Sequence, residues 1–270
     1  MPQKKSINFF APFVALLLLG AAGCATAPEN DPEALAEWHE INDPIEPTNR
    51  AIFDFNLGLD RIIFRPLAEG YRWLFPDFLR DAIQNVLANI DEPVNFFNAA
   101  LQGNAERAAT VVGRIAINST VGVGGMFDVA SSEFGLEPVD EDFGQTLAVW
   151  SANSGGYIML PVFGPSSVRD GIGRGVDLFL NPLGYLFANT NTEYIGVGLN
   201  VVQGIDQRSR NLDILDKIER TSVDFYAAIR SLYRQRRMDL INNGVPEFEV
   251  DPFFSDLPLY FDETEMSDVE

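Results

Sequence analysis

Apolar residues recur every three or four positions through most of this chain, which is the spacing of one face of an α-helix. Proline and glycine interrupt the pattern at short intervals, so the helices are expected to be short pieces joined by tight turns. Residues 43–244 show no strand-rich half and no break in composition. One all-α domain over residues 43–244 is therefore predicted. The clearest apolar repeats are Ile52, Phe55, Leu59, Ile62 and Ile63, and Leu79, Ile83, Val86, Leu87 and Ile90.

Residues that commonly begin or end helices mark the expected boundaries. The expected starts are Asp91 with Pro93, Asn104, Asp140, Ser166 or Ser167, Thr192 and Asn211, and the expected breaks or ends are Pro66, Pro76, Gly103 and Gly244. The segment from Ser166 or Ser167 is expected to run to Leu180, and residues 157–163 are expected to be extended.

Composition argues against most classes of enzyme. The chain has one histidine, His39, and one cysteine, Cys24, so it cannot supply a zinc cage, an iron–sulfur site or a disulfide. No G-x-S-x-G motif is present. The 39 acidic and 19 basic residues give a formal net charge of -20, which would repel the phosphate backbone of nucleic acid. We therefore expect no catalytic site, no metal or other cofactor, and no nucleic-acid partner.

The first 23 residues have the pattern of an export signal. Lys4 and Lys5 precede an apolar run over residues 9–19, which is too short to span a membrane. Cys24 follows the small residues Ala21-Ala22-Gly23, an arrangement that resembles a bacterial lipobox. Cleavage before Cys24 and attachment of acyl chains such as palmitate are expected, and two or three chains anchor a protein stably. Ala25, the residue after Cys24, resembles the sorting signal of lipoproteins that are sent to the outer membrane. The alternative is an ordinary secretory signal in which Cys24 has no special role.

The two ends of the mature chain differ in charge. Residues 24–42 are predicted to form a lipidated tether with one short helix, and residues 245–270 an acidic, flexible tail. A basic region precedes that tail and contains Arg208, Arg210, Lys217, Arg220, Arg230, Arg234, Arg236 and Arg237. Acids within this region are expected to neutralise half of it in surface pairs. The last four of these arginines are expected to be the less neutralised ones.

A set of short motifs resembles the MlaA/VacJ family of outer-membrane lipoproteins. The opening block is Asp43-Pro44-Ile45-Glu46-Pro47-Thr48-Asn49-Arg50, followed by Phe53-Asp54-Phe55-Asn56, Leu59-Asp60 and Arg65-Pro66. Later blocks in the family's order are Asn95, Leu101-Gln102-Gly103, Arg114, Asn118-Ser119-Thr120-Val121-Gly122, Gly125, Asp128-Val129-Ala130, Asp142-Phe143-Gly144-Gln145-Thr146-Leu147, Leu160-Pro161, Gly164-Pro165-Ser166 and Arg169-Asp170. The resemblance covers about half of the chain, and it is the ordered set that makes it specific.

The resemblance implies a function and partners. Family members are helical rings in the inner leaflet of the outer membrane, with a central amphipathic channel. Mislocalised phospholipids leave the outer leaflet through the channel and pass to a soluble periplasmic phospholipid carrier, which preserves lipid asymmetry. The implied membrane partner is a trimeric outer-membrane porin. The same role is expected here, as a lipid-anchored protein of the outer membrane that faces the periplasm.

Two groups of residues are candidates for the gate or channel. Asn49, Arg50 and Phe55 lie in the opening block, where Asn49 is expected to cap a helix and Arg50 to pair with Asp54. The resemblance suggests that packing of this helix, through Ile52, Phe55 and Leu59, sets the channel's resting state. The second group lies in two glycine-rich stretches and comprises Gly122, Gly124, Gly125, Phe127, Gly173 and Gly175. For any one glycine, a tight turn or close helix packing is the alternative.

Two other functions remain open from sequence alone. A structural lipoprotein that braces porins without moving lipid would need the same anchor and the same apolar outer faces. A lipid-modifying enzyme is less consistent with the sequence, because His39 lies in the predicted tether and paired acids such as Asp140, Glu141 and Asp142 are common at solvated helix starts.

Overall fold

The computed structural model describes residues 43–244. The predicted signal peptide (1–23), the tether (24–42) with Cys24 and His39, and the acidic tail (245–270) lie outside the described residues. The described part is mainly helical and contains one two-stranded sheet, so the all-α prediction is confirmed. The elements are α3 (Glu46–Leu59), η2 (Asp60–Phe64), α4 (Arg65–Leu74), α5 (Asp77–Leu101), α6 (Ala105–Thr120), α7 (Val129–Phe134), α8 (Phe143–Val149), β1 (Tyr157–Leu160), β2 (Gly164–Ser167), α9 (Val168–Leu180), α10 (Pro182–Thr190), α11 (Glu193–Arg210), α12 (Leu212–Thr221) and α13 (Phe225–Ile241).

Several predicted helix ends are confirmed. The side chain of Asn104 accepts a hydrogen bond from the N–H of Arg107 at the start of α6, and Ser167 does the same for Asp170 in α9. Gly103 follows α5 with φ of 75°, the left-handed conformation that glycine adopts without strain. These caps satisfy backbone groups that the ends of a helix otherwise leave unpaired.

Two predicted helix starts in the middle of the chain are wrong. Asp142, not Asp140, caps α8, because its carboxylate accepts from the N–H of Gln145 at 2.9 Å. Pro93 does not restart a helix but lies inside α5. An internal proline costs a helix about 3 kcal/mol or more. Buried residues on both sides of it, Leu87 and Asn98, show that α5 is packed along its length, and this packing holds the helix together.

The first three elements form one continuous helical run from residue 46 to residue 74. Pro66 does not separate two segments, because it lies directly after a π-helical turn within this continuous run. The π-helical turn η2 precedes it. Such turns are rare and often mark functional positions in a helix. Pro76 does separate α4 from α5, as predicted.

The sheet is a small hairpin. Residues 157–160 are extended as expected, whereas residues 161–163 form the turn into β2, a strand that the sequence did not predict. The strands are antiparallel, with Tyr157 opposite Ser167 and Leu160 opposite Gly164. The apolar cluster beside the hairpin contains Tyr157, Met159 and Tyr226, with Ile52, Phe53 and Tyr233 packed against it.

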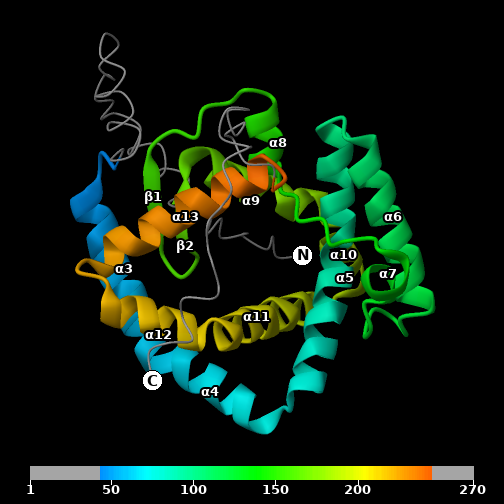
Figure 1. The fold of residues 1–270 in the computed structure, drawn as a ribbon, viewed down its shortest axis with the longest axis horizontal. Coiled ribbons are helices and arrows are strands. Elements are labelled where there is room, and N and C mark those ends of the chain that lie inside the picture. The colour runs from blue at the N-terminus through cyan, green and yellow to red at the C-terminus, as the bar shows by residue number, and fades with distance from the viewer. Residues whose placement is uncertain (1–42, 245–270) are drawn as a thin grey trace, which may run out of the picture.

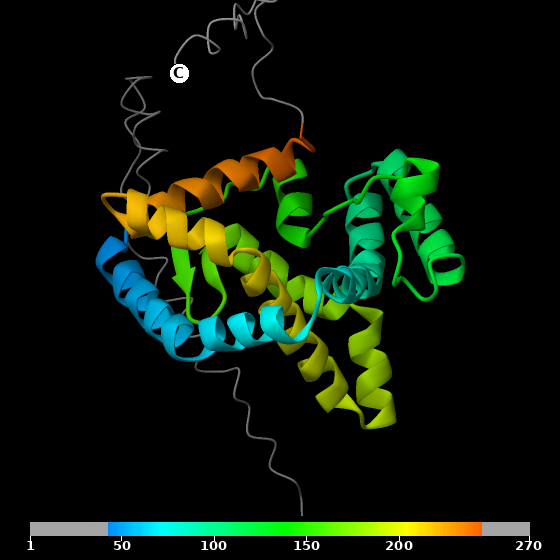
Figure 2. The same cartoon turned by 60° about the horizontal axis from the view of Figure 1, so that its bottom comes forward.

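The helices are arranged as a ring (Figure 1). In that view α3 and α4 follow one side and the bottom, α5 rises on the other side, α13 crosses the upper half and α11 crosses the lower half. The first and last helices of the described chain are therefore neighbours, because the start of α13 lies beside α3 and the β hairpin. Figure 2 shows α10 and α11 projecting from one face of the ring.

Candidate functional site

Asn49 joins α3 to β1. Its side chain is buried, and its amide donates to Asp43 Oδ1 at 2.7 Å and to the Tyr157 carbonyl at 3.0 Å. Its Oδ1 accepts from the N–H of Met159 at 2.8 Å. The prediction that Asn49 caps a helix is wrong, because α3 has already begun at Glu46 and Ile45 occupies the cap position. Asn49 instead makes the hydrogen bonds to the backbone of β1 that a neighbouring strand would otherwise make.

Asn56 makes a second contact of this kind two helical turns later. Its amide donates to the Leu160 carbonyl at 2.9 Å, and its Oδ1 accepts from the N–H of Val162 at 2.8 Å. Val162 has φ of 70°, an unfavourable conformation for a β-branched residue. Asn56 thus stabilises the hairpin turn. The seven-residue spacing, which places two asparagines on one helix face, was the available sequence signal.

Arg50 links α3 to the start of α13. Its guanidinium forms bonds with Asp224 at 3.2 and 2.6 Å and with Glu46 at 2.7 Å, and it lies 4.4 Å from the ring centre of Tyr226. The prediction that Arg50 pairs with Asp54 is wrong, because its guanidinium binds Glu46 and Asp224 instead. The hydrogen bond from Arg50 lowers the pKa of Asp224 below its ordinary value. Both side chains are about 40% exposed, so this pair contributes little stability by itself.

Asp43 ties the beginning of the described chain to α13 as well. Its carboxylate accepts from the hydroxyl of Tyr226 and pairs with Arg230 at 3.1 Å. Together with Asn49 and Arg50, it forms what we call the α3 anchor, a group of polar contacts that holds α3 against β1 and α13. The anchor closes the ring between residues that are more than 170 positions apart.

Phe55 does not pack as predicted. Its side chain is 57% exposed, whereas Phe53 packs against Phe225 and Tyr226 with ring centres 5.4 and 5.5 Å apart. The helical phase explains the difference, because Asn49, Phe53 and Asn56 share the face of α3 that meets the hairpin and α13. Phe55 lies on another face.

The glycines around residue 122 serve close packing. A side-chain carbon at Gly122 would lie 2.4 Å from the Phe127 carbonyl oxygen, and one at Gly125 would lie 2.7 Å from the Asn89 side chain. Gly124 has φ of 70° but open space around it, and Phe127 is exposed. These residues form the turn between α6 and α7, across the ring from α3 (Figure 1). They do not meet the α3 anchor.

Gly173 allows α9 to approach α8. A side-chain carbon there would lie 2.3 Å from the backbone nitrogen of Gly144, so no larger residue fits without moving a helix. Gly175, two positions later, is exposed and has nothing within 4 Å of such a carbon. The structure therefore places the candidate residues in three separate regions instead of one site.

Buried ion pairs connect the helices on the far side of the ring. Arg114 pairs with Glu92 at 2.7 Å and with Asp128 at 3.2 Å, and the Arg114 and Glu92 side chains are only 4% and 3% exposed. Burial raises the pKa of Glu92 above its ordinary value, although Arg114 opposes that shift. Arg237 on α13 pairs with Asp142 at 2.5 Å and with Asp170 at 2.8 Å. We call these six residues the buried framework.

The basic region is more fully paired than the sequence suggested. Arg230 pairs with Asp43, Arg236 with Asp140 and Arg237 with Asp142 and Asp170. Their acids lie outside the region and are 67 or more positions away in sequence, so local charge counting could not find them. The prediction that these three arginines are less neutralised than the rest of the basic region is wrong. Arg234 also has a partner.

Large apolar side chains are exposed on several outer faces. The α4–α5 corner exposes Trp73, Leu74 and Phe78, and η2 exposes Ile62. The end of α9 and the projecting α10–α11 pair expose Leu178, Phe179, Tyr185, Leu186, Tyr194, Val197 and Val201. Large apolar side chains gathered on outer elements are typical of contacts with membranes or other proteins. Among the described helices, none is both long and apolar enough to cross a membrane.

Comparison with known proteins places these features in a family. A family model described as MlaA lipoprotein matches residues 41–240. The intermembrane phospholipid transport system lipoprotein MlaA of Escherichia coli is 34% identical over 206 residues, 75% of this chain and 79% of that protein. Its counterpart from Haemophilus influenzae is 30% identical over 233 residues, 85% of this chain and 89% of that protein. An uncharacterized Rickettsia conorii protein is 38% identical over 199 residues, 73% of this chain and 77% of that protein.

A solved structure has the same fold. It is reported under the words "Structural basis for maintenance of bacterial outer membrane lipid asymmetry" and superposes with a TM-score of 0.65 at 35% identity. The match covers 74% of this chain and 99% of that chain. The resemblance found in the sequence motifs is thus confirmed over the whole ring, and the chain belongs to the MlaA lipoprotein family.

Proposed function

We propose that this protein removes mislocalised phospholipids from the outer leaflet of the outer membrane and passes them toward a soluble periplasmic carrier. The observation that carries the proposal is the family match, because relatives with the same fold are named as lipoproteins of intermembrane phospholipid transport. The route is a central amphipathic channel of the ring, and no bond is made or broken during transport.

The exposed apolar faces support a location in the membrane. Side chains such as Trp73 and Phe179 lose contact with water if the ring sits among acyl chains. An acylated Cys24 would hold the protein there, since each buried methylene contributes about 0.8 kcal/mol. A trimeric porin is the proposed membrane partner. We therefore place the protein on the periplasmic side of the outer membrane.

The α3 anchor is proposed to set the resting state of the channel. If Asn49 is lost, the Tyr157 carbonyl and the Met159 N–H lose their partner, which costs about 1–3 kcal/mol for each buried group left unpaired. A change of that size shifts a two-state equilibrium of a few kcal/mol without unfolding a domain. Asn49, not Phe55, is the residue through which the gate is tested.

The test compares outer-leaflet phospholipid content and detergent sensitivity in cells with the unaltered gene, without the gene, and with variants at matched protein level. Loss of the gene is expected to raise outer-leaflet phospholipid, and Cys24→Ser is expected to do the same because the anchor is lost. Asn49→Ala is expected to give a leaky envelope in a pattern unlike that of the deletion. Phe55→Ala, an exposed position on the same helix, is the matched control and should behave like the unaltered protein.

The outcomes separate the alternatives. A brace for porins would leave outer-leaflet phospholipid unchanged when the gene is deleted, provided that porin levels are restored. A stable Asn49→Ala protein that behaves like the deletion would remove the gating role and leave α3 as scaffold. Phospholipid hydrolysis by the purified protein, abolished by His39→Ala, would favour the enzyme instead.

A further inference from the structure

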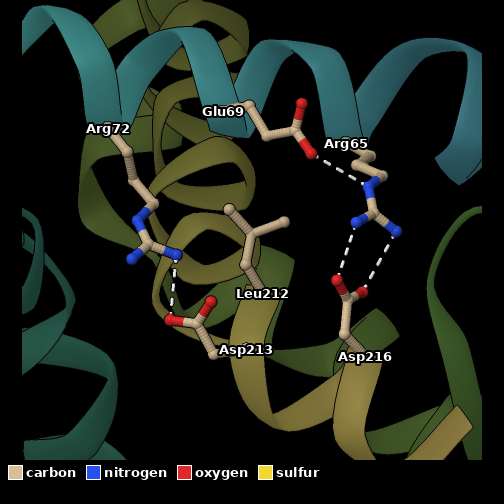
Figure 3. Close-up of a pocket in the computed structure, with 6 residues that line it drawn as sticks. All are labelled: Arg65, Glu69, Arg72, Leu212, Asp213 and Asp216. Carbon is tan, nitrogen blue, oxygen red and sulfur yellow. Dashed lines mark hydrogen bonds and ion pairs between the residues drawn. The ribbon is translucent and has the colours of Figure 1, made fainter. Parts of the chain in front are cut away.

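A charged notch lies between α4 and α12 (Figure 3). It has a volume of about 270 Å³ and is lined by Arg65, Glu69, Arg72, Leu212, Asp213 and Asp216. At roughly 30 Å³ for each water molecule, that volume exceeds what one or two bound waters occupy. Leu212 is buried and lies between two ion pairs, with Glu69 above it in the view. The notch thus presents both signs of charge around a small apolar floor.

The two ends of the notch differ in how firmly they are paired. Arg65 is held by Asp216 at 3.1 and 2.7 Å and by Glu69 at 2.9 Å. Arg72 makes one ion pair with the described residues, from Nη1 to Asp213 at 3.0 Å, and these side chains are 37% and 83% exposed. Exposed pairs of this kind contribute little and exchange partners readily. Arg72 and Asp213 can therefore each turn to a ligand at small cost.

We propose that the notch binds the phosphoethanolamine headgroup of a phospholipid. In this arrangement Arg72 binds the phosphodiester, and Asp213 and Glu69 bind the primary ammonium. Guanidinium groups suit phosphate, and carboxylates suit an ammonium. The three carboxylates outnumber the two guanidinium groups, so a headgroup that carries an ammonium is favoured over a purely anionic one. This inference rests on the proposed function and names the class of lipid.

Trp73 gives independent support for a headgroup at this level. It follows Arg72 in sequence, lies one helical turn after Glu69, and is 86% exposed. Tryptophan is enriched where acyl chains meet headgroups, because its ring is apolar with one polar N–H. If Trp73 lies at that boundary, the charged notch of the same helix lies at headgroup depth.

The experiment measures which lipid the full-length, acylated protein captures. The purified protein is incubated with vesicles of phosphatidylethanolamine and phosphatidylglycerol in equal amounts and with identical acyl chains, recovered, and analysed for bound lipid by mass spectrometry. The unaltered protein is expected to enrich phosphatidylethanolamine about threefold, the scale of one exposed ion pair. Asp213→Asn should reduce the bound ratio toward that of the vesicles, because it removes a contact to the ammonium. Arg72→Gln should instead lower the captured amount of both lipids, because both carry the phosphodiester. Arg61→Gln, which breaks an exposed pair with Glu219 outside the notch, should keep the enrichment.

Each outcome decides the proposal. Captured lipid without a headgroup bias, or an equal bias in all variants, overturns the notch while leaving the proposed function intact. No captured lipid with any protein contradicts the proposed function and the notch together. A parallel titration uses soluble glycerophosphoethanolamine. If that compound binds through Arg72 while lipid capture shows no bias, the notch serves a soluble ligand and the lipid assignment is wrong.

Discussion

Two regions of this protein contain the same kind of ion pair, between an arginine and a carboxylate. The regions differ in how far these pairs are exposed to water. In the buried framework, Arg114 and Glu92 are almost completely removed from solvent. At the seam between η2–α4 and α12, Arg61 pairs with Glu219 and Arg72 with Asp213, each with one side chain more than half exposed, and Arg65 pairs with the half-buried Asp216. We call these three pairs the α4–α12 seam. The number of ion pairs is similar, but their consequences are not.

Burial decides what each ion pair can do. Removing one partner from a buried pair leaves a charge in a poorly solvated place, so the framework fixes helix positions strictly. Water screens the seam, whose pairs gain little from being formed and lose little when they part. The framework therefore acts as a rigid frame, and the seam is the side of the ring where charged groups remain available.

The largest effect is expected at Arg114. Arg114→Ala should destabilise the protein by roughly 3–5 kcal/mol, because Glu92 and Asp128 remain without their cation. Urea denaturation followed by circular dichroism gives the free energy of unfolding. Glu92→Leu combined with Arg114→Met should recover part of the lost stability. A loss below about 1 kcal/mol for Arg114→Ala alone would show that this buried pair contributes no more than an exposed pair.

Gly173 and Gly175 test how rigid the frame is. Gly173→Ala should cost roughly 1–3 kcal/mol, since the added carbon meets the backbone of Gly144 and pushes α9 from α8. Gly175→Ala, on the same helix but with open space, should instead stabilise by about 0.5–1 kcal/mol through the lower flexibility of alanine. Thermal unfolding measures both, and equal effects at the two positions would show that α8 and α9 can move apart freely.

Asp91 gives the framework side a pH dependence. Burial raises the pKa of Asp91 above its ordinary 3.8, while Gln203 opposes this shift with a hydrogen bond. The folded protein then binds the proton more tightly than the unfolded chain, so this group loses stabilising effect as pH rises from about 4 through the raised pKa. Asp91→Asn lacks this effect and should gain stability relative to the unaltered protein between pH 4 and 7. A pH-independent difference would contradict the raised pKa.

The smallest effect is expected at the seam. Arg61→Gln should change the free energy of unfolding by only about 0–1 kcal/mol, and the difference should shrink further in high salt. Urea denaturation at low and high salt measures it. A loss of several kcal/mol would mean that the seam is as constrained as the framework.

The sequence predicted the elements better than their contacts. Apolar spacing and caps such as Asn104 and Ser167 depend on residues a few positions apart, so they were readable. α10 was missed although Asn181 caps it with Pro182 at its first position. The partner of Arg50 could not be found, because Asp224 is 174 positions away and its proximity depends on ring closure.

The choice between Phe53 and Phe55 shows the same limit. Both fit a helical repeat, and which one packs depends on where the hairpin and α13 lie. From the sequence, the glycines could be predicted to let backbone segments approach closely, but not which segments these are. In the structure, Gly122 and Gly173 allow two separate close contacts. Local chemistry thus predicted the parts of the ring, and long-range polar contacts determined how the candidate residues are distributed in it.

The pairing of Asn49 and Asn56 with the hairpin has a consequence for solubility. Backbone groups of alternate residues in a strand point to the same side, so the Tyr157 carbonyl and the Met159 N–H form the edge of β1 that faces α3. An uncovered strand edge can pair with a strand from another molecule and seed aggregation. By covering this edge with amide side chains, α3 protects a short sheet that has two strands within residues 43–244. A second copy of this chain is thereby less able to pair with this edge.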